Sequence, residues 1–371
     1  MTIEKTIGKL FAATLLCCIA AFEPVANAAD PNANLDPNRD QPMINSTASA
    51  QHATTITLLG TMGGPPEDPS GRRAQTASLI TVNGVHYLID AGGGVVRRLV
   101  KDGLSPYSVK KVFITHNHLD HTAELAEFMS SSWFNGWFFH DKNYMDKSTK
   151  KPFVEIYGPP DTAELFDGAM KFLSVSARIF QADATGAGTM KMPEEVFAVR
   201  TIEKPGKIFD DGNVKVTAVE NTHYSVPLPS GLAENGDLTY AYRFDTPSGS
   251  VVFTGDSGPS ANITKLAEGA DVLVSEVLDF NFLIKSWEGV GITKAPNPDS
   301  IRFHMEHQHL SPEEVGKMAA KAHVKTVILN HIVPGDVSPQ FFVDYVAAVK
   351  KYYSGPVIMG QDLFQYSLIK Q

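Results

Sequence analysis

Hydrophobic and polar residues alternate in short segments from about residue 54 onward. Two apolar, β-branched runs at residues 76–82 and 85–90 flank Asn83 and Gly84. An Asn-Gly pair accepts positive φ at both central positions of a type I′ turn. The pattern therefore predicts a β-hairpin, followed by a buried strand at residues 109–114 and a helix at about residues 122–132.

The same order of strand, polar loop and helix returns in the second half of the chain. Ser311 to Glu314 form a capping box with proline at the first helical position, which predicts a helix from there to about His323. The other predicted elements are strands at residues 250–254, 271–277, 325–332 and 356–368 and a helix at residues 338–353. Two successive sets of strands and helices predict an α/β fold in which two mixed sheets pack face to face, with helices on the outer faces.

The N-terminal segment has the composition of a secretory signal peptide. Lys5 and Lys9 precede an apolar run at residues 10–22, and the small residues Ala26 and Ala28 follow it. We expect cleavage to remove residues 1–29 and the mature protein to be periplasmic or secreted, without membrane attachment. Residues 30–52 are rich in Pro, Asn, Asp and Ser and predict a flexible arm, which leaves residues 53–371 as one catalytic domain.

The composition narrows the classes of function. Cys17 and Cys18 lie in the predicted signal peptide, so disulfide and thiolate chemistry are excluded from the mature chain. A hydrophobic share of 43% over 371 residues is enough for a large buried core. The formal net charge of −9 offers no general attraction for a polyanion, so we expect no nucleic-acid partner. A homodimer is left open.

The strongest chemical signal is a loop between the predicted strand at residues 109–114 and the helix that follows it. His116, His118, Asp120 and His121 lie within six residues of each other. His116 and His118 are two residues apart, so in an extended loop both rings point toward one metal ion, while Asp120 and His121 face a second. Imidazole and carboxylate ligands at this density favour a borderline divalent metal. We expect zinc, with manganese as the alternative.

Three more candidate ligands follow other predicted strands: His223, Asp256 and His331. Together with the loop, they resemble the metallo-β-lactamase superfamily over residues 56–368. The resemblance implies the αββα sandwich of that superfamily, hydrolytic chemistry and two zinc ions per chain. It also implies a division of the ligands between the two ions: His116, His118 and His223 on the first, Asp120, His121 and His331 on the second, and Asp256 on both.

Two further motifs resemble the ribonuclease Z and arylsulfatase branch of that superfamily. One is the glycine-rich segment at residues 58–66, with Arg73 and the hairpin end at residues 88–92. The other is His309-Leu310-Ser311, where the branch has a histidine beside the metals that protonates the leaving group or stabilises the transition state. The resemblance implies that His309 is catalytic together with Asp120, with a surface role as the alternative for His309. Glu276 is a candidate for orienting His309, and backbone amides are the alternative partners of its carboxylate.

The remaining histidines and aromatic residues have weaker patterns. His304 and His307 share a segment with His309 and are minor candidates, whereas His52, His86, His140 and His323 lack metal-ligand spacing. The aromatic segment at residues 131–139 predicts core packing, with a wall that binds a flat leaving group as the alternative. Trp287 would extend such a wall.

These observations predict an exported dinuclear zinc hydrolase that cleaves sulfate or phosphodiester bonds of small-molecule aryl esters, as an arylsulfatase does. A cyclic-nucleotide phosphodiesterase is the main alternative. A lactonase, a β-lactamase, a ribonuclease Z-type RNA-processing enzyme and a non-catalytic zinc-binding protein are less favoured. Export and negative net charge argue against the transfer-RNA 3′ processing enzyme. Residues 161–204 also predict ordinary helix and loop rather than that enzyme's long arm for transfer RNA.

Overall fold

The structure of the protein is a computed structural model. It describes residues 54–68, 70–139, 141–148, 152–183, 190–224, 237–287, 298–335 and 342–369. The predicted signal peptide and arm therefore lie outside the described residues, as does the first part of the helix predicted at residues 338–353. Within the described ranges, no helix is both long and apolar enough to cross a membrane.

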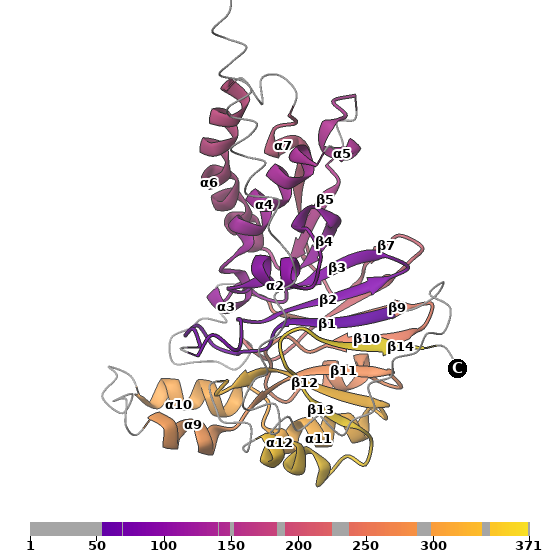
Figure 1. The fold of residues 1–371 in the computed structure, drawn as a ribbon. Helices are drawn as coiled ribbons and strands as arrows, with labels where there is room; N and C mark the ends of the chain where they lie inside the picture. Colours follow the sequence, from indigo (N-terminus) through magenta and orange to yellow (C-terminus); the bar gives the residue numbers. More distant parts are fainter. Residues whose placement is uncertain are drawn as a thin grey trace, which may run out of the picture. The chain divides into compact units, whose positions relative to one another are not determined.

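The first sheet has seven strands in the order β14-β1-β2-β3-β4-β5-β6 (Figure 1). Its strands are β1 (Thr54–Gly60), β2 (Ala77–Val82), β3 (Val85–Ile89), β4 (Val109–Phe113), β5 (Val154–Gly158), β6 (Phe197–Thr201) and β14 (Phe364–Leu368). Pairing is antiparallel from β14 to β3 and parallel from β3 to β6. Asn83 and Gly84 join β2 and β3 with φ of 50° and 78°, so the predicted hairpin and its turn are confirmed.

The second sheet also has seven strands, in the order β13-β12-β11-β10-β9-β8-β7. They are β7 (Gly206–Asp210), β8 (Lys215–Glu220), β9 (Tyr240–Thr246), β10 (Gly249–Phe253), β11 (Val272–Leu278), β12 (Thr326–Val333) and β13 (Val357–Met359). Pairing is antiparallel from β7 to β10 and parallel from β10 to β13. Every residue of β11 and β12 is buried, which explains why these parallel strands show continuous apolar runs.

Helices cover the outer face of each sheet. Around the first sheet lie α2 (Val95–Lys101), the 3₁₀ turn η2 (Pro106–Ser108), α3 (Leu119–Thr122), α4 (Leu125–Phe138), α5 (Lys142–Met145), α6 (Thr162–Ala182) and α7 (Pro193–Val196). The second half of the chain contributes α8 (Ala261–Leu266), α9 (Phe280–Trp287), α10 (Pro298–His307), α11 (Pro312–Lys321) and α12 (Phe342–Lys350).

Three large apolar cores hold these layers together. One lies between the two sheets and contains Phe113 and Phe244. A second joins the first sheet to its helices through side chains such as Phe128, and a third joins the second sheet to α11 and α12 through Val315 and Val349. The predicted order of helix, sheet, sheet and helix is confirmed.

Two predicted elements differ from the structure. The helix expected at residues 122–132 is longer: α3 and α4 follow each other, and α4 continues through the aromatic segment to Phe138. The single closing strand expected at residues 356–368 is wrong, because β13 lies in the second sheet and β14 in the first. Leu363, with φ of 65°, turns the chain between them.

This crossing point is fixed by the buried carboxylate of Asp362. It accepts hydrogen bonds from the amide and hydroxyl of Thr61, at 3.1 and 2.7 Å, and from the amide of Ala74, at 2.7 Å. It also pairs with the guanidinium of Arg98 at 2.8 Å. Arg73 is buried next to this group and donates to the carbonyl oxygen of Gly360 at 2.9 Å. Asp362 therefore neutralises two arginines where the two sheets meet.

We expect Asp362→Ala to lower the free energy of unfolding by about 3–5 kcal/mol, because it leaves buried positive charge without its partner. Denaturant-induced unfolding measures the effect. Asp210→Ala is the matched control, since Asp210 pairs with Lys207 at the surface and exposed pairs contribute about 1 kcal/mol or less. Equal losses in the two variants would show that Asp362 has no special role in stability.

Candidate metal centre

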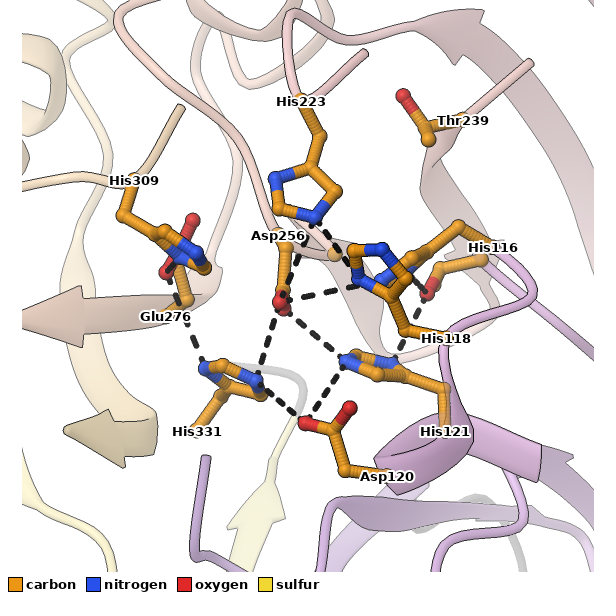
Figure 2. A network of polar contacts seen from close by, with 12 residues as sticks. His116, His118, Asp120, His121, His223, Thr239, Asp256, Glu276, His309 and His331 are labelled. Atoms are coloured by element: carbon orange, nitrogen blue, oxygen red, sulfur yellow. Dashed lines mark hydrogen bonds and ion pairs between the residues drawn. The ribbon is translucent and has the colours of Figure 1, made fainter. Parts of the chain in front are cut away.

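The structure brings all seven predicted ligands together at one end of the two sheets (Figure 2). His116 and His118 follow β4, and Asp120 and His121 lie in α3. The other three come from the loop after β8, the loop after β10 and the strand β12: His223, Asp256 and His331. Carboxyl ends of neighbouring parallel strands meet at one edge of a sheet, so segments far apart in sequence converge there.

The seven side chains form two groups that share Asp256. His116, His118, His223 and Asp256 make one group, and Asp120, His121, Asp256 and His331 make the other, each with its donor atoms within 4.8 Å of one another. Asp256 lies between them, with Oδ1 3.2 Å from His121 Nε2 and Oδ2 3.1 Å from His331 Nε2. This grouping is the same as the division that the family resemblance implied.

The donor atoms fit divalent metal ions. His116 Nε2, His121 Nε2 and Asp256 Oδ1 are buried and have no hydrogen-bond partner among the described residues. A buried polar atom without a hydrogen bond costs about 1–3 kcal/mol. His116 Nε2 therefore requires compensation, and His121 Nε2 and Asp256 Oδ1 have only each other, at 3.2 Å. Imidazole nitrogens and carboxylate oxygens that converge on two points are the ligands that zinc and similar ions take. The clusters could therefore hold metal, while zinc and a count of two remain predictions.

Surrounding hydrogen bonds aim the imidazoles at these points. His223 donates from Nδ1 to the carbonyl oxygen of Gln308 at 2.8 Å, and His121 Nδ1 lies 2.9 Å from Asp90 Oδ2. Each bond fixes the tautomer that leaves Nε2 free for a metal. Asp90 was not among the site residues predicted from the sequence. Its signal was a carboxylate directly after the apolar strand β3, which parallel pairing places beside the end of β4.

The glycine-rich segment before β2 closes one side of the centre. The Gly64 amide donates to Asp120 Oδ2 at 2.8 Å. A Cβ atom on Gly63 would collide with the ring of His331. Small residues in this segment therefore allow the backbone to approach the ligands, a role that differs from phosphate binding in a P-loop.

Burial and charge separate the histidines into two protonation classes. Burial lowers the pKa of His116 and His223 well below the usual value and that of His118 to about 4. Burial also opposes protonation of His121 and His331, but nearby carboxylates outweigh it: Asp256, Asp90 and Asp120 for His121, and Asp256 and Asp120 for His331. They raise the pKa of His121 well above its usual value and that of His331 to about 10. A metal ion that binds the second group would replace these protons.

His309 lies beside the two groups and is paired with Glu276. Its Nδ1 is 2.7 Å from Glu276 Oε2, and both side chains are buried. Burial alone lowers the pKa of an imidazole, but the Glu276 carboxylate raises the pKa of His309 above its usual value. Glu276 thus contacts His309, and its carboxylate also accepts a hydrogen bond from the backbone amide of Ser257. Both partners considered for Glu276 from the sequence are therefore present. His309 Nε2 is left to face His304, whose Nε2 lies 3.4 Å away.

Of the minor candidates, His304 joins the cluster, because His223, His304 and His309 place donor atoms within 4.8 Å of one another. The remaining candidates lie outside it. His307 is exposed and stacks on Phe303, His86 bonds to Thr81, and His323 has φ of 53° after the end of α11. The aromatic segment is part of α4: Trp133 is buried and donates to the carbonyl oxygen of Lys191. Core packing is therefore the role of Trp133. His52, His140 and the side chain of Trp287 lie outside the described residues.

Known proteins are similar to this chain over most of its length. The ribonuclease Z of Mycobacterium bovis (strain BCG / Pasteur 1173P2) is 28% identical over 311 residues, which cover 83% of this chain and 96% of that protein. The metallo-beta-lactamase fold protein YhfI from Bacillus subtilis has a TM-score of 0.57 and 19% identity, over 85% of this chain and 99% of that chain. The short form of human tRNase Z has a TM-score of 0.53 and 20% identity, over 85% of this chain and 99% of that chain.

These relatives correct two predictions. A ribonuclease Z that matches four fifths of the chain contradicts an arylsulfatase-like hydrolase of small aryl esters, so that prediction is wrong. The expectation of a small-molecule substrate and no nucleic-acid partner is wrong for the same reason. The net charge was a poor basis for predicting the partner, because it sums the charges of the whole chain and does not describe the charge of any one surface. The relatives' names do not bear on a homodimer.

The fold, the two ligand groups and the relatives agree with a direct family match. Residues 86–332, more than half of the chain, match the family described as "Beta-lactamase superfamily domain". Hydrolysis at a metal centre is the general chemistry of such a site. The chain therefore belongs to the beta-lactamase superfamily.

Proposed function

We propose that this protein is a metal-dependent ribonuclease that hydrolyses phosphodiester bonds in structured RNA. The observation that carries the proposal is the pair of ligand groups that share Asp256, with the Glu276–His309 pair next to them. The 28% identity to a ribonuclease Z over 83% of the chain supports RNA as the substrate class. A transfer RNA with a 3′ extension is the first substrate to test, because a solved structure with the same fold is a tRNase Z.

The proposed division of labour follows from the contacts. His116, His118 and His223 would hold one ion, Asp120, His121 and His331 the other, and Asp256 would contact both; we propose zinc for each. When bound, such ions lower the pKa of water and stabilise negative charge that develops on a phosphate.

His309 would donate a proton to the leaving oxygen. Because its Nδ1–H is held by Glu276, the proton available for transfer is the one on Nε2. Glu276 stabilises the protonated ring, so that Nε2 can give this proton to the oxygen that leaves. An exported location stays a prediction beside this proposal.

We expect the zinc-loaded full chain to cut a transfer RNA transcript that carries a 3′ extension, and to stop when the metal is removed. His118→Ala should slow cleavage by about 100-fold or more, since it removes a ligand and weakens metal binding. His323→Ala is the matched control, because this histidine is exposed and belongs to neither ligand group. Gel analysis of end-labelled RNA measures both variants.

Comparison of His118→Ala with His323→Ala also distinguishes cleavage by this protein from cleavage by a contaminating nuclease. Cleavage that His118→Ala leaves unchanged would come from another enzyme and would contradict the proposal. Absence of RNA cleavage by a chain that holds its full complement of zinc would contradict it as well.

A further inference from the structure

Two histidines face each other beside the metal centre and belong to neither of the ligand groups that share Asp256. His304 lies in α10, and His309 lies between the end of α10 and the start of α11. Their Nε2 atoms are 3.4 Å apart, and their rings are almost perpendicular, at 87°. Together with His223 they place a third set of donor atoms within 4.8 Å of one another. The chain thus brings imidazole nitrogens close together outside the two ligand groups.

The Nδ1 atom of each ring is held by a side-chain oxygen. His304 donates from Nδ1 to Gln308 Oε1, and His309 donates from Nδ1 to Glu276 Oε2 at 2.7 Å. A hydrogen bond at Nδ1 orients the ring and directs Nε2 away from that partner, which is how proteins orient histidines that bind metals. Each Nε2 then points toward the other ring, so the two nitrogens share one small volume.

The separation of the two Nε2 atoms suits a shared metal ion better than a shared proton. N–H donors in good hydrogen bonds lie about 2.7–3.2 Å from their acceptors, so 3.4 Å is long for a hydrogen bond. Zinc binds imidazole nitrogen at about 2.0–2.1 Å in tetrahedral geometry, which separates two such nitrogens by about 3.3–3.4 Å. The two rings therefore stand at the spacing that one tetrahedral ion requires.

We propose that His304 and His309 bind a further zinc ion, and that this ion inhibits the enzyme. His223 does not complete the site, because its Nδ1 donates to the carbonyl oxygen of Gln308 and its Nε2 faces His118 in the first ligand group. The chain supplies two nitrogens, and water would fill the remaining positions, as it does at open zinc sites. With so few protein ligands, the further site fills after the main centre, when zinc is in excess.

The inhibition rests on the proposed function, in which His309 Nε2 gives a proton to the leaving oxygen. A metal ion binds an imidazole nitrogen through its lone pair, so it takes the place of this proton, which passes to solvent. His309 then has no proton to donate while the ion is bound. His304 is half-buried rather than enclosed, so the pair lies at the edge of the centre. Free zinc would thereby control the rate of RNA cleavage.

Isothermal titration calorimetry of the zinc-loaded full chain tests the site without a substrate. After gel filtration has removed loosely held metal, added zinc should bind as one further ion per chain. His304→Ala should lose this binding and keep the metal that survives gel filtration, because His304 belongs to neither main ligand group. His307→Ala is the matched control, since His307 ends the same helix but is exposed and stacks on Phe303. It should bind the further ion as the parent chain does.

RNA cleavage at buffered concentrations of free zinc tests the inhibition. In His304→Ala the zinc concentration for half-inhibition should rise by about tenfold or more, since a ligand is lost. Each variant is compared with its own rate at low zinc. His304→Phe keeps an aromatic ring of similar shape without a ligand nitrogen and should give the same result, which separates metal binding from packing. His307→Ala should be inhibited as the parent chain is.

Three results would overturn the proposal. One is a parent chain that binds no zinc beyond the metal that survives gel filtration. Another is binding of the further ion by His304→Ala and His304→Phe as tightly as by the parent chain. The third is inhibition by zinc that these two variants leave unchanged. Calorimetry uses no RNA, so its result decides the site even where the proposed function fails.

Discussion

Asp256→Ala is expected to lower the metal content from about two ions per chain to one or fewer and to slow RNA cleavage by about 1,000-fold or more. Asp256 is the residue that both ligand groups share, with carboxylate oxygens 3.2 Å from His121 Nε2 and 3.1 Å from His331 Nε2. A metal centre supplies several kcal/mol of transition-state stabilisation, and each 1.4 kcal/mol corresponds to about tenfold in rate. Elemental analysis and cleavage assays on the same preparation measure both effects.

The fold should persist in this variant, because Asp256 is not one of the apolar side chains that form the cores. Circular dichroism and the thermal midpoint check this. Asp344→Ala removes an exposed carboxylate from α12 and is the matched control, which should keep both metal and activity. Two ions per chain and unchanged turnover in Asp256→Ala would show that the shared carboxylate does not bridge the two groups.

The convergence of the ligand side chains could be predicted from the sequence in part, because the densest part of the cluster is local. Four ligands lie within residues 116–121, and a loop that short confines them to one volume whatever the rest of the chain does. His223, Asp256 and His331 could be assigned only through family resemblance, since nothing in their own segments shows that β8, β10 and β12 end at the same edge. Strand register supplies that information, and register is a property of the folded sheet.

The features that the sequence did not predict also depend on how the strands pair. Asp90 belongs to the site because β3 pairs with β4, so that its carboxylate reaches His121 Nδ1 at 2.9 Å. The segment at residues 356–368 is apolar on both sides of Leu363, and periodicity cannot tell to which sheet each half belongs. The buried contacts of Asp362 with Thr61, Ala74 and Arg98 fix the point at which the chain passes from one sheet to the other.

The substrate could not be derived because the metal ligands are common to many hydrolyses. A centre that lowers the pKa of water and stabilises an oxyanion suits sulfate esters and phosphodiesters alike. Substrate choice depends on surfaces outside the cluster, and the net charge of −9 was a poor guide to them. A relative that matches 83% of the chain narrows the choice of substrate class, which the metal-ligand cluster alone does not.

His309→Ala is expected to slow cleavage of RNA by about 100- to 10,000-fold, the usual contribution of a general acid. The ribose oxygen that leaves RNA is a poor leaving group without a proton, and Glu276 holds the His309 ring at 2.7 Å so that Nε2 can supply it. A nucleotide p-nitrophenyl phosphodiester releases a phenolate that needs little protonation. The same variant should therefore lose less than about tenfold on that ester.

This contrast separates proton transfer from the alternatives, because a lost contact to phosphate oxygens would slow both substrates about equally. Glu276→Gln is the matched partner variant: it keeps a hydrogen-bonding side chain of the same size but removes the charge that raises the pKa of His309. It should show the same contrast with a smaller loss on RNA. Equal losses on the two substrates would refute the general-acid role. Loss of metal from His309→Ala would instead make His309 a ligand, since Asp256, Glu276, His309 and His331 also place donor atoms within 4.8 Å of one another.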